Sequence, residues 1–214
     1  KEMLPVVDKP LIQYAVEEAV MAGITEMIFV TGRTKRAIAD HFDKAYELEH
    51  QLEKSGKTQL LKIAREVVPK GVSFTYIRQT EALGLGHAVL TAAHLIGEEP
   101  FAVLLADDLI SPQASALGQL IKQYELFGNS VIAVQSVPSP EISAYGVISG
   151  PKHADRLFLL DNIVEKPKFE DAPSDKGVTG RYIFTPPILD KLRVLQPGAG
   201  GEYQLTDAIQ ALLS

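Results

Sequence analysis

Residues 101–110 read FAVLLADDLI, and this segment gives the clearest indication of the fold class. Its first seven residues form a short, nearly continuous apolar run that ends in the carboxylate pair Asp107 and Asp108. A run that is apolar on both faces predicts a buried central strand, 101–107, in an open α/β sheet. Ligands of such sheets bind in the crevice beyond the carboxyl ends of the strands. The two aspartates either bind a hard cation such as Mg²⁺, which offsets their repulsion, or only cap a turn.

The segments on both sides of this strand alternate between helical and strand-like patterns. This alternation predicts one α/β domain with mostly parallel strands. In the last third, short strand-like segments with few helices between them indicate antiparallel additions and therefore a mixed sheet. The predicted elements are a helix over 11–20, a strand over 26–31, a helical excursion over 34–68, a strand over 72–77, a helix over 86–96, a helix over 115–127, a strand over 130–137, strand-like segments at 147–149, 157–165 and 178–184, and a closing helix over 204–213.

The composition excludes several classes of protein. With 27 acidic residues against 21 lysines and arginines, the net charge of −6 disfavours binding to nucleic acid or to an anionic membrane. The chain has no cysteine, so it has neither disulfides nor a thiolate metal site. No apolar run is long enough to span a bilayer, and no signal peptide is recognisable. We therefore expect a cytoplasmic protein that folds around a core, since 46% of its residues are hydrophobic.

The loop QTEALGLGHA, which begins at Gln79, joins a predicted strand to a predicted helix. Glycines such as Gly84 at this junction let a ligand approach the backbone, although an ordinary tight turn has the same composition. The loop is not a dinucleotide-binding fingerprint, because the third glycine is missing. Gln79 offers both a donor and an acceptor, as the reading of a nucleobase edge requires. His87 is more typical of a packing residue than of a catalyst.

Other polar groups are ambiguous by themselves. The segment VEKPK ends an apolar strand on Glu165 and Lys166, which either bind sugar hydroxyls and a phosphate or form a surface ion pair. Gly146 marks a bulge or a close backbone contact. Asp207 lies early in the closing helix, where it either favours the helix dipole or is a second metal ligand. Lys1 is a cation just before a helix, and its role cannot be read from the pattern alone.

Seven motifs taken together resemble the sugar-phosphate nucleotidyltransferases, and within them the bacterial UTP–glucose-1-phosphate uridylyltransferases, or UDP-glucose pyrophosphorylases. The resemblance covers nearly the whole chain, and it implies a three-layer α/β/α Rossmann-like fold with a mixed, mostly parallel central sheet. The motifs, in order, are KEMLPVVDKP from residue 1, GLGHAV from 84, LADD from 105, AYGV from 144, VEKPK from 164, GRY from 180 and GAGGEYQLTDAI from 198.

The resemblance also implies a reaction and a set of roles. The phosphate of glucose 1-phosphate attacks the α-phosphorus of UTP, pyrophosphate leaves, and UDP-glucose forms. A sugar phosphate is already ionised, so no general base is needed, and catalysis is positioning plus charge neutralisation. By position, Asp107 and Asp207 hold Mg²⁺; Gln79 and the Gly84 backbone read uracil; Glu165 and the Gly146 backbone bind glucose hydroxyls; Lys166 binds the sugar phosphate; Lys1 binds the phosphates of the nucleotide or leaving group; and Asp108 is a further substrate-binding candidate.

The chain departs from the family pattern at its ends. The family's glycine-rich phosphate loop lies before the position of Lys1, and we expect residues 1–214 to be a single catalytic domain truncated at both ends. On this reading, the 214-residue chain is inactive and the full-length protein is a homo-oligomer with small-molecule partners only. Two alternatives stay open: a thymidylyltransferase or another sugar-1-phosphate nucleotidyltransferase, and a non-catalytic nucleotide-sugar sensor.

Overall fold

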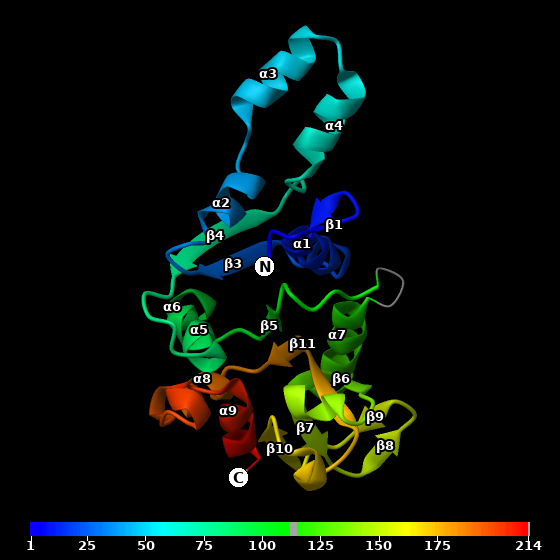
Figure 1. The fold of residues 1–214 in the computed structure, drawn as a ribbon, viewed down its shortest axis with the longest axis vertical. Coiled ribbons are helices and arrows are strands. Elements are labelled where there is room, and N and C mark those ends of the chain that lie inside the picture. The colour runs from blue at the N-terminus through cyan, green and yellow to red at the C-terminus, as the bar shows by residue number, and fades with distance from the viewer. Residues whose placement is uncertain (112–114, 214) are drawn as a thin grey trace.

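A computed structural model gives the α/β fold, and it describes residues 1–111 and 115–213 (Figure 1). Helix α1 matches its prediction because residues of one face, such as Ile12 and Val16, are buried while the helix ends before Gly23. The helices are α1 (Leu11–Met21), α2 (Arg36–Phe42), α3 (Tyr46–Lys54), α4 (Thr58–Glu66), α5 (Leu85–Thr91), α6 (Ala93–Ile96), α7 (Ala116–Phe127), α8 (Pro187–Val194) and α9 (Leu205–Leu212), with 3₁₀ helices η1 (Glu141–Ala144), η2 (Phe169–Asp171) and η3 (Ala199–Gly201).

The strands largely follow the predicted ranges, with one difference within residues 101–110. The predicted central strand ends at Leu104, three residues earlier than expected, and its four residues are only partly buried. The strands are β1 (Pro5–Val6), β2 (Lys9–Pro10), β3 (Glu26–Thr31), β4 (Ser73–Arg78), β5 (Phe101–Leu104), β6 (Val131–Ser136), β7 (Gly146–Ser149), β8 (Lys152–Ala154), β9 (Leu157–Phe158), β10 (Asn162–Glu165) and β11 (Lys176–Phe184).

Strand pairing is mixed, as predicted. Strands β3 and β4 are parallel neighbours, with Glu26 opposite Ser73. Strand β11 pairs antiparallel with β5, β6 and β7, so these three share one direction, and β10 pairs antiparallel with β7. The antiparallel additions expected in the last third are therefore confirmed. Strand β6 runs along one edge of β11, whereas β7 and β5 pair with the two ends of its other edge.

The core has separate parts. Buried residues of β7, β10 and β11 pack with α8 and α9, and Phe184 and Ile188 at their centre are fully buried. A second cluster lies under α2, where the rings of Phe29 and Phe42 stack with centroids 5.3 Å apart. A third cluster joins α1 and α7 over Ile183 of β11. These clusters fix the positions of β10, α9 and the turn after β5.

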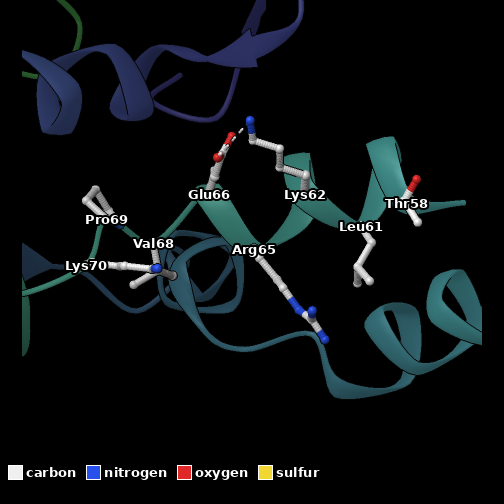
Figure 2. Close-up of a pocket in the computed structure, with 8 residues that line it drawn as sticks. All are labelled: Thr58, Leu61, Lys62, Arg65, Glu66, Val68, Pro69 and Lys70. Atoms are coloured by element: carbon white, nitrogen blue, oxygen red, sulfur yellow. Dashed lines mark ion pairs between the residues drawn. The ribbon is translucent and has the colours of Figure 1, made fainter.

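The helical excursion predicted over 34–68 contains α2, α3 and α4. Helices α3 and α4 project away from the sheets as an arm at the top of Figure 1. A hollow of about 560 Å³ lies along α4, and Figure 2 shows its lining residues, including the Lys62–Glu66 ion pair of 3.7 Å. None of the residues predicted to bind substrate lines this hollow. In the part of the chain that the structure describes, no helix is both long and apolar enough to cross a membrane.

Candidate functional site

The carboxylates Asp107 and Asp108 lie in a turn just beyond β5. The turn begins where Leu105 N donates to Gly180 O of β11 at 2.8 Å, and Asp108 N donates back to Leu105 O at 3.3 Å. Strand β5 ends here because the chain turns after this bond to β11. The bond joins residues that are 75 positions apart in the sequence, so no local pattern marks it. The expected position of both aspartates at the end of β5 is confirmed.

Lys1 and Asp107 form an ion pair between Lys1 Nζ and Asp107 Oδ2. Burial acts to raise the pKa of Asp107, but hydrogen bonds from Lys1 and the backbone outweigh it, so this pKa lies below its usual value. The same hydrogen bond raises the pKa of Lys1. The pKa of Asp108 is raised by burial and by the charge of Asp107. Asp107 is thus the more readily ionised member of the pair, and the Lys1 ammonium faces it.

The loop after β4 brings Gln79, Gly84 and His87 together. Gln79 Nε2 donates to Gly84 O at 3.0 Å and lies 2.9 Å from His87 Nδ1. Gly84 has a φ of +97°, a conformation that favours glycine, and a Cβ there would lie 2.9 Å from Glu202 Cβ. Tyr203 N donates to Leu83 O at 2.8 Å. The loop is therefore not an isolated tight turn, because it packs directly against the segment that precedes α9.

Gly146, Glu165 and Thr206 form a second corner. The register of β7 and β10 places Glu165 opposite Gly146, and Thr206 Oγ1 donates to Glu165 Oε2 at 3.0 Å. A Cβ on Gly146 would lie 2.9 Å from Thr206 Cγ2 and 3.3 Å from Glu165 Oε2. Thr206 was not predicted from the sequence. The only feature of the sequence that could have indicated Thr206 is its position beside Asp207 in the last motif.

Lys166 follows Glu165 in a left-handed backbone conformation with a φ of +42°. Its backbone N donates to Tyr145 O at 3.0 Å, and its Nζ lies 3.5 Å from Glu165 Oε1. A non-glycine residue at positive φ is strained, and strain of this kind is frequent at functional sites. The lysine side chain is mostly exposed, at 62%, so it is available to an anionic ligand.

Tyr182 connects the turn after β5 with this corner. Its side chain is 95% buried on β11, and burial raises the pKa of its hydroxyl, with further increases from the charges of Glu165 and Asp108. Both carboxylates are therefore close enough to act on the same phenol.

Asp207 lies in the first turn of α9, as predicted. A Cβ on Gly198 would lie 2.6 Å from Asp207 Oδ2, so the loop before α9 packs closely over this carboxylate. Within residues 1–111 and 115–213, Asp107 and Asp207 share no hydrogen bond or ion-pair partner, and no group of three or more His, Cys, Asp or Glu side chains is spaced to hold a metal. A magnesium ion is commonly held by one or two carboxylates plus substrate phosphates. The donor chemistry fits such an ion, because Asp107 is a partly exposed carboxylate with a lowered pKa, and a metal ion would share it with the Lys1 ammonium that now pairs with it.

A buried ion pair supports the aspartate turn, and the sequence assigned it no role. Arg181 Nε donates to Glu18 Oε2 at 2.9 Å, and the two side chains are 1% and 7% exposed. The signals in the sequence are a single arginine inside the apolar strand β11 and an acid beside Ala19 on the buried face of α1.

Comparisons with known proteins show the family of the chain. The nucleotidyl transferase family model matches residues 1–214. The UTP–glucose-1-phosphate uridylyltransferase of Pseudomonas aeruginosa is 52% identical over 211 residues, which cover 98% of this chain and 75% of that protein. The enzyme of the same name from Bacillus subtilis is 53% identical over 215 residues, covering 99% and 72%. A crystal structure of UDP-glucose pyrophosphorylase complexed with UDP-glucose superimposes with a TM-score of 0.89 at 46% identity, covering 100% of this chain and 78% of that one. The chain belongs to the nucleotidyl transferase family.

Proposed function

We propose that this chain is a nucleotidyltransferase that transfers the uridylyl group of UTP to glucose 1-phosphate, giving UDP-glucose and pyrophosphate. The observation that carries the proposal is the convergence of two predicted corners on one short segment, 202–206. Gly84 packs against Glu202 and Tyr203 at one end, and Glu165 accepts a hydrogen bond from Thr206 at the other. A nucleotide sugar has a base and a hexose joined by a diphosphate, and this arrangement offers one corner for each.

Gln79 and Gly84 make up the base corner. The amide nitrogen of Gln79 is used by Gly84 O and His87, while its Oε1 accepts no hydrogen bond within the part of the chain that the structure describes. This oxygen can accept the N3–H of uracil, and the backbone N–H of Gly84 can donate to a uracil carbonyl. Thymine presents the same groups, so the preference for uracil follows from the similar proteins named above.

Glu165 and Gly146 make up the sugar corner. Glu165 Oε2 is held by Thr206, and Oε1 faces the Lys166 ammonium at 3.5 Å. A carboxylate fixed in this way can accept hydrogen bonds from neighbouring hexose hydroxyls, and Gly146 leaves room for the ring to approach the backbone. Lys166 then meets the phosphate of glucose 1-phosphate.

Group transfer needs no base. An oxygen of the sugar phosphate forms the new bond to the α-phosphorus of UTP, and the bond from that phosphorus to the bridging oxygen breaks, so pyrophosphate leaves with the electron pair. Asp107 and Asp207 would hold the divalent ion, which we propose to be Mg²⁺, and when bound this ion neutralises charge on the α-phosphate. Lys1 and Lys166 orient the phosphates, and Asp108 borders the same space. Positioning and charge neutralisation account for the catalysis.

A pyrophosphate-release assay with a nucleotide panel tests this function on the chain extended to the full length of its relatives, because we expect residues 1–214 alone to be inactive. UTP with glucose 1-phosphate and Mg²⁺ should give turnover, whereas dTTP, ATP and GTP should be poor substrates. Preference for dTTP would point to a thymidylyltransferase. Binding of UDP-glucose without any turnover would point to a sensor. Asp107→Asn should abolish metal-dependent turnover, and Lys166→Ala should mainly weaken the use of glucose 1-phosphate, with Lys168→Ala as the matched control.

We further propose a cytoplasmic location and a homo-oligomer. Support for association comes from exposed apolar side chains on the arm, where Tyr46 is 68% exposed and Ile63 is 59% exposed. Light scattering coupled to size-exclusion chromatography tests the oligomeric state. A single monomeric species at micromolar concentration would contradict it.

A further inference from the structure

The turn that carries Asp107 is held by a buried guanidinium. Arg181 Nη1 donates to Leu105 O at 2.8 Å, and Arg181 Nη2 donates to Asp108 O at 2.9 Å. These two carbonyls lie at the start and the end of the turn. One planar group therefore ties both ends of the turn to β11, and Asp107 lies between the two tied points.

Glu18 in turn fixes the guanidinium. Its Oε2 accepts the Arg181 Nε–H at 2.9 Å, and its Oε1 accepts the backbone N–H of Leu117 at 2.8 Å. Both carboxylate oxygens are thus in use, and the side chain is almost fully buried. The network joins α1, β11 and the start of α7. Because the guanidinium fork is planar and rigid, its two outward donors have a fixed direction.

Gly180 of β11 contacts the same turn at Asp108 and Leu105. It has a φ of +39°, and a Cβ at this position would collide with the Asp108 carboxylate. The Asp108 carboxylate therefore packs directly on the β11 backbone. The neighbouring Asp107 carboxylate is directed instead to the ammonium of Lys1.

Stability alone does not account for this network. A buried ion pair contributes little net stability compared with apolar side chains of similar volume. The pair instead fixes the conformation of the turn, because Arg181 donates hydrogen bonds to two of its carbonyls and an apolar side chain could donate none.

We propose that Arg181 is a positioning residue of the nucleotidyl transfer site: through the carbonyls of Leu105 and Asp108 it fixes the direction of the Asp107 carboxylate toward the phosphates and their metal ion. This inference rests on the proposed function. It predicts that loosening the network weakens metal-assisted transfer even in fully folded protein, without a matching loss of sugar binding.

The test compares two variants of the network with a control. Glu18→Gln/Arg181→Met removes both charges together, so neither is left buried and unpaired, and it deletes both donors to the turn. Arg181→Lys keeps a positive charge beside Glu18 but lacks the planar guanidinium and its two donors to the turn. This variant replaces the double variant in the comparison if the double variant does not fold. Leu61→Ala is the control, because Leu61 is buried in α4, on the arm that projects away from the sheets, and the substitution lowers stability at a place remote from the turn.

Two measurements are made on folded protein well below its melting temperature. Amide hydrogen exchange should be roughly fivefold faster at the backbone N–H groups of Leu105 and Asp108 in the network variants, since each loses the support of about one hydrogen bond. The Mg²⁺ concentration for half-maximal pyrophosphate release should rise on the order of tenfold, as when outer-shell partners of metal ligands are removed. KM for glucose 1-phosphate should stay within about twofold.

The control separates positioning from stability. Leu61→Ala should lower the melting temperature but leave both the turn exchange and the Mg²⁺ dependence at their wild-type values. Wild-type exchange at the turn, or an unchanged Mg²⁺ dependence, in the network variant would overturn the positioning role. Absence of turnover in the extended wild-type chain would contradict the proposed function, whereas equal Mg²⁺ dependence in wild type and variant would contradict only the role of Arg181.

Discussion

Thr206 donates a hydrogen bond of 3.0 Å to Glu165, joining the first turn of α9 to the last residue of β10. The two residues are 41 positions apart, and Gly146 lies against both of them. Thr206 is 6% exposed, so its hydroxyl has little access to water. The bond therefore holds Oε2 of Glu165 in place, and the orientation of the carboxylate fixes the direction of Oε1.

Thr206→Val should raise KM for glucose 1-phosphate by roughly fivefold, because a neutral hydrogen bond contributes about 1 kcal/mol and Glu165 then loses its fixed orientation. KM for UTP should change little. The matched control is Thr91→Val, since the Thr91 hydroxyl bonds only to the backbone carbonyl of His87 in its own helix. An equal rise in KM for both substrates would show that Thr206 supports the site as a whole and not the sugar corner.

Gly180→Ala should lower turnover on the order of tenfold, because the new methyl group displaces the Asp108 carboxylate and with it the turn that carries Asp107. The left-handed backbone adds a strain of about 1–2 kcal/mol. Gly128→Ala is the matched control, since Gly128 also has a positive φ, +67°, but open space at its Cβ position. Similar losses of turnover in the two variants would attribute the effect to backbone strain alone.

Much of the fold was predictable because local patterns set it. The strand β3 has the predicted bounds, and α1 and α7 differ from prediction by one residue at an end. The end of β5 was not predictable. Leu105 is as apolar as the residues before it and still bonds to Gly180, the next position of the β5–β11 register, but the pairing stops there, where Gly180 has a φ of +39°. The end of a pairing between distant strands has no local signal.

The site was predictable to the extent that single residues have distinctive chemistry. Asp107 and Glu165 were proposed from the polar end of an apolar strand and Gln79 from the glycine-bearing loop that follows one, and their roles stay predictions. Glu18 and Arg181 were not, because a charged residue in a helix or strand is usually solvent-exposed, and the partner that permits burial lies 163 positions away. Contacts of this kind follow from packing and have no pattern in the sequence.

Glu18→Ala should reduce the free energy of unfolding by about 3–5 kcal/mol, because it leaves the Arg181 guanidinium buried without its carboxylate partner. The neighbouring Glu17 provides the control. Its pair with Lys9, at 2.8 Å, is about one-third exposed on both sides, so Glu17→Ala should cost no more than about 1 kcal/mol. Urea unfolding of the two variants measures both values. Equal losses would contradict the buried pair as the main source of the cost.

Glu2 provides a pH-dependent contribution to stability. Burial acts to raise its pKa, but hydrogen bonds from Lys35 and the backbone and the charge of Lys35 outweigh this effect and lower the pKa from 4.5 to about 2. The folded state therefore holds the ionised form more strongly than the unfolded state does. The contribution is fully present above the unfolded pKa and is lost as pH falls through the folded pKa, so the window runs from about pH 4.5 down to about pH 2.

The difference in unfolding free energy between the wild type and Glu2→Gln should accordingly be constant near neutral pH and shrink as pH falls below about 4.5. Urea unfolding from about pH 6 to about pH 3 measures this difference. Lys35→Met should remove the same pH dependence, because it deletes the cation that lowers the Glu2 pKa. If the difference stayed constant to about pH 3, or if Lys35→Met kept the pH dependence of the wild type, then the Lys35 ion pair would not be its source.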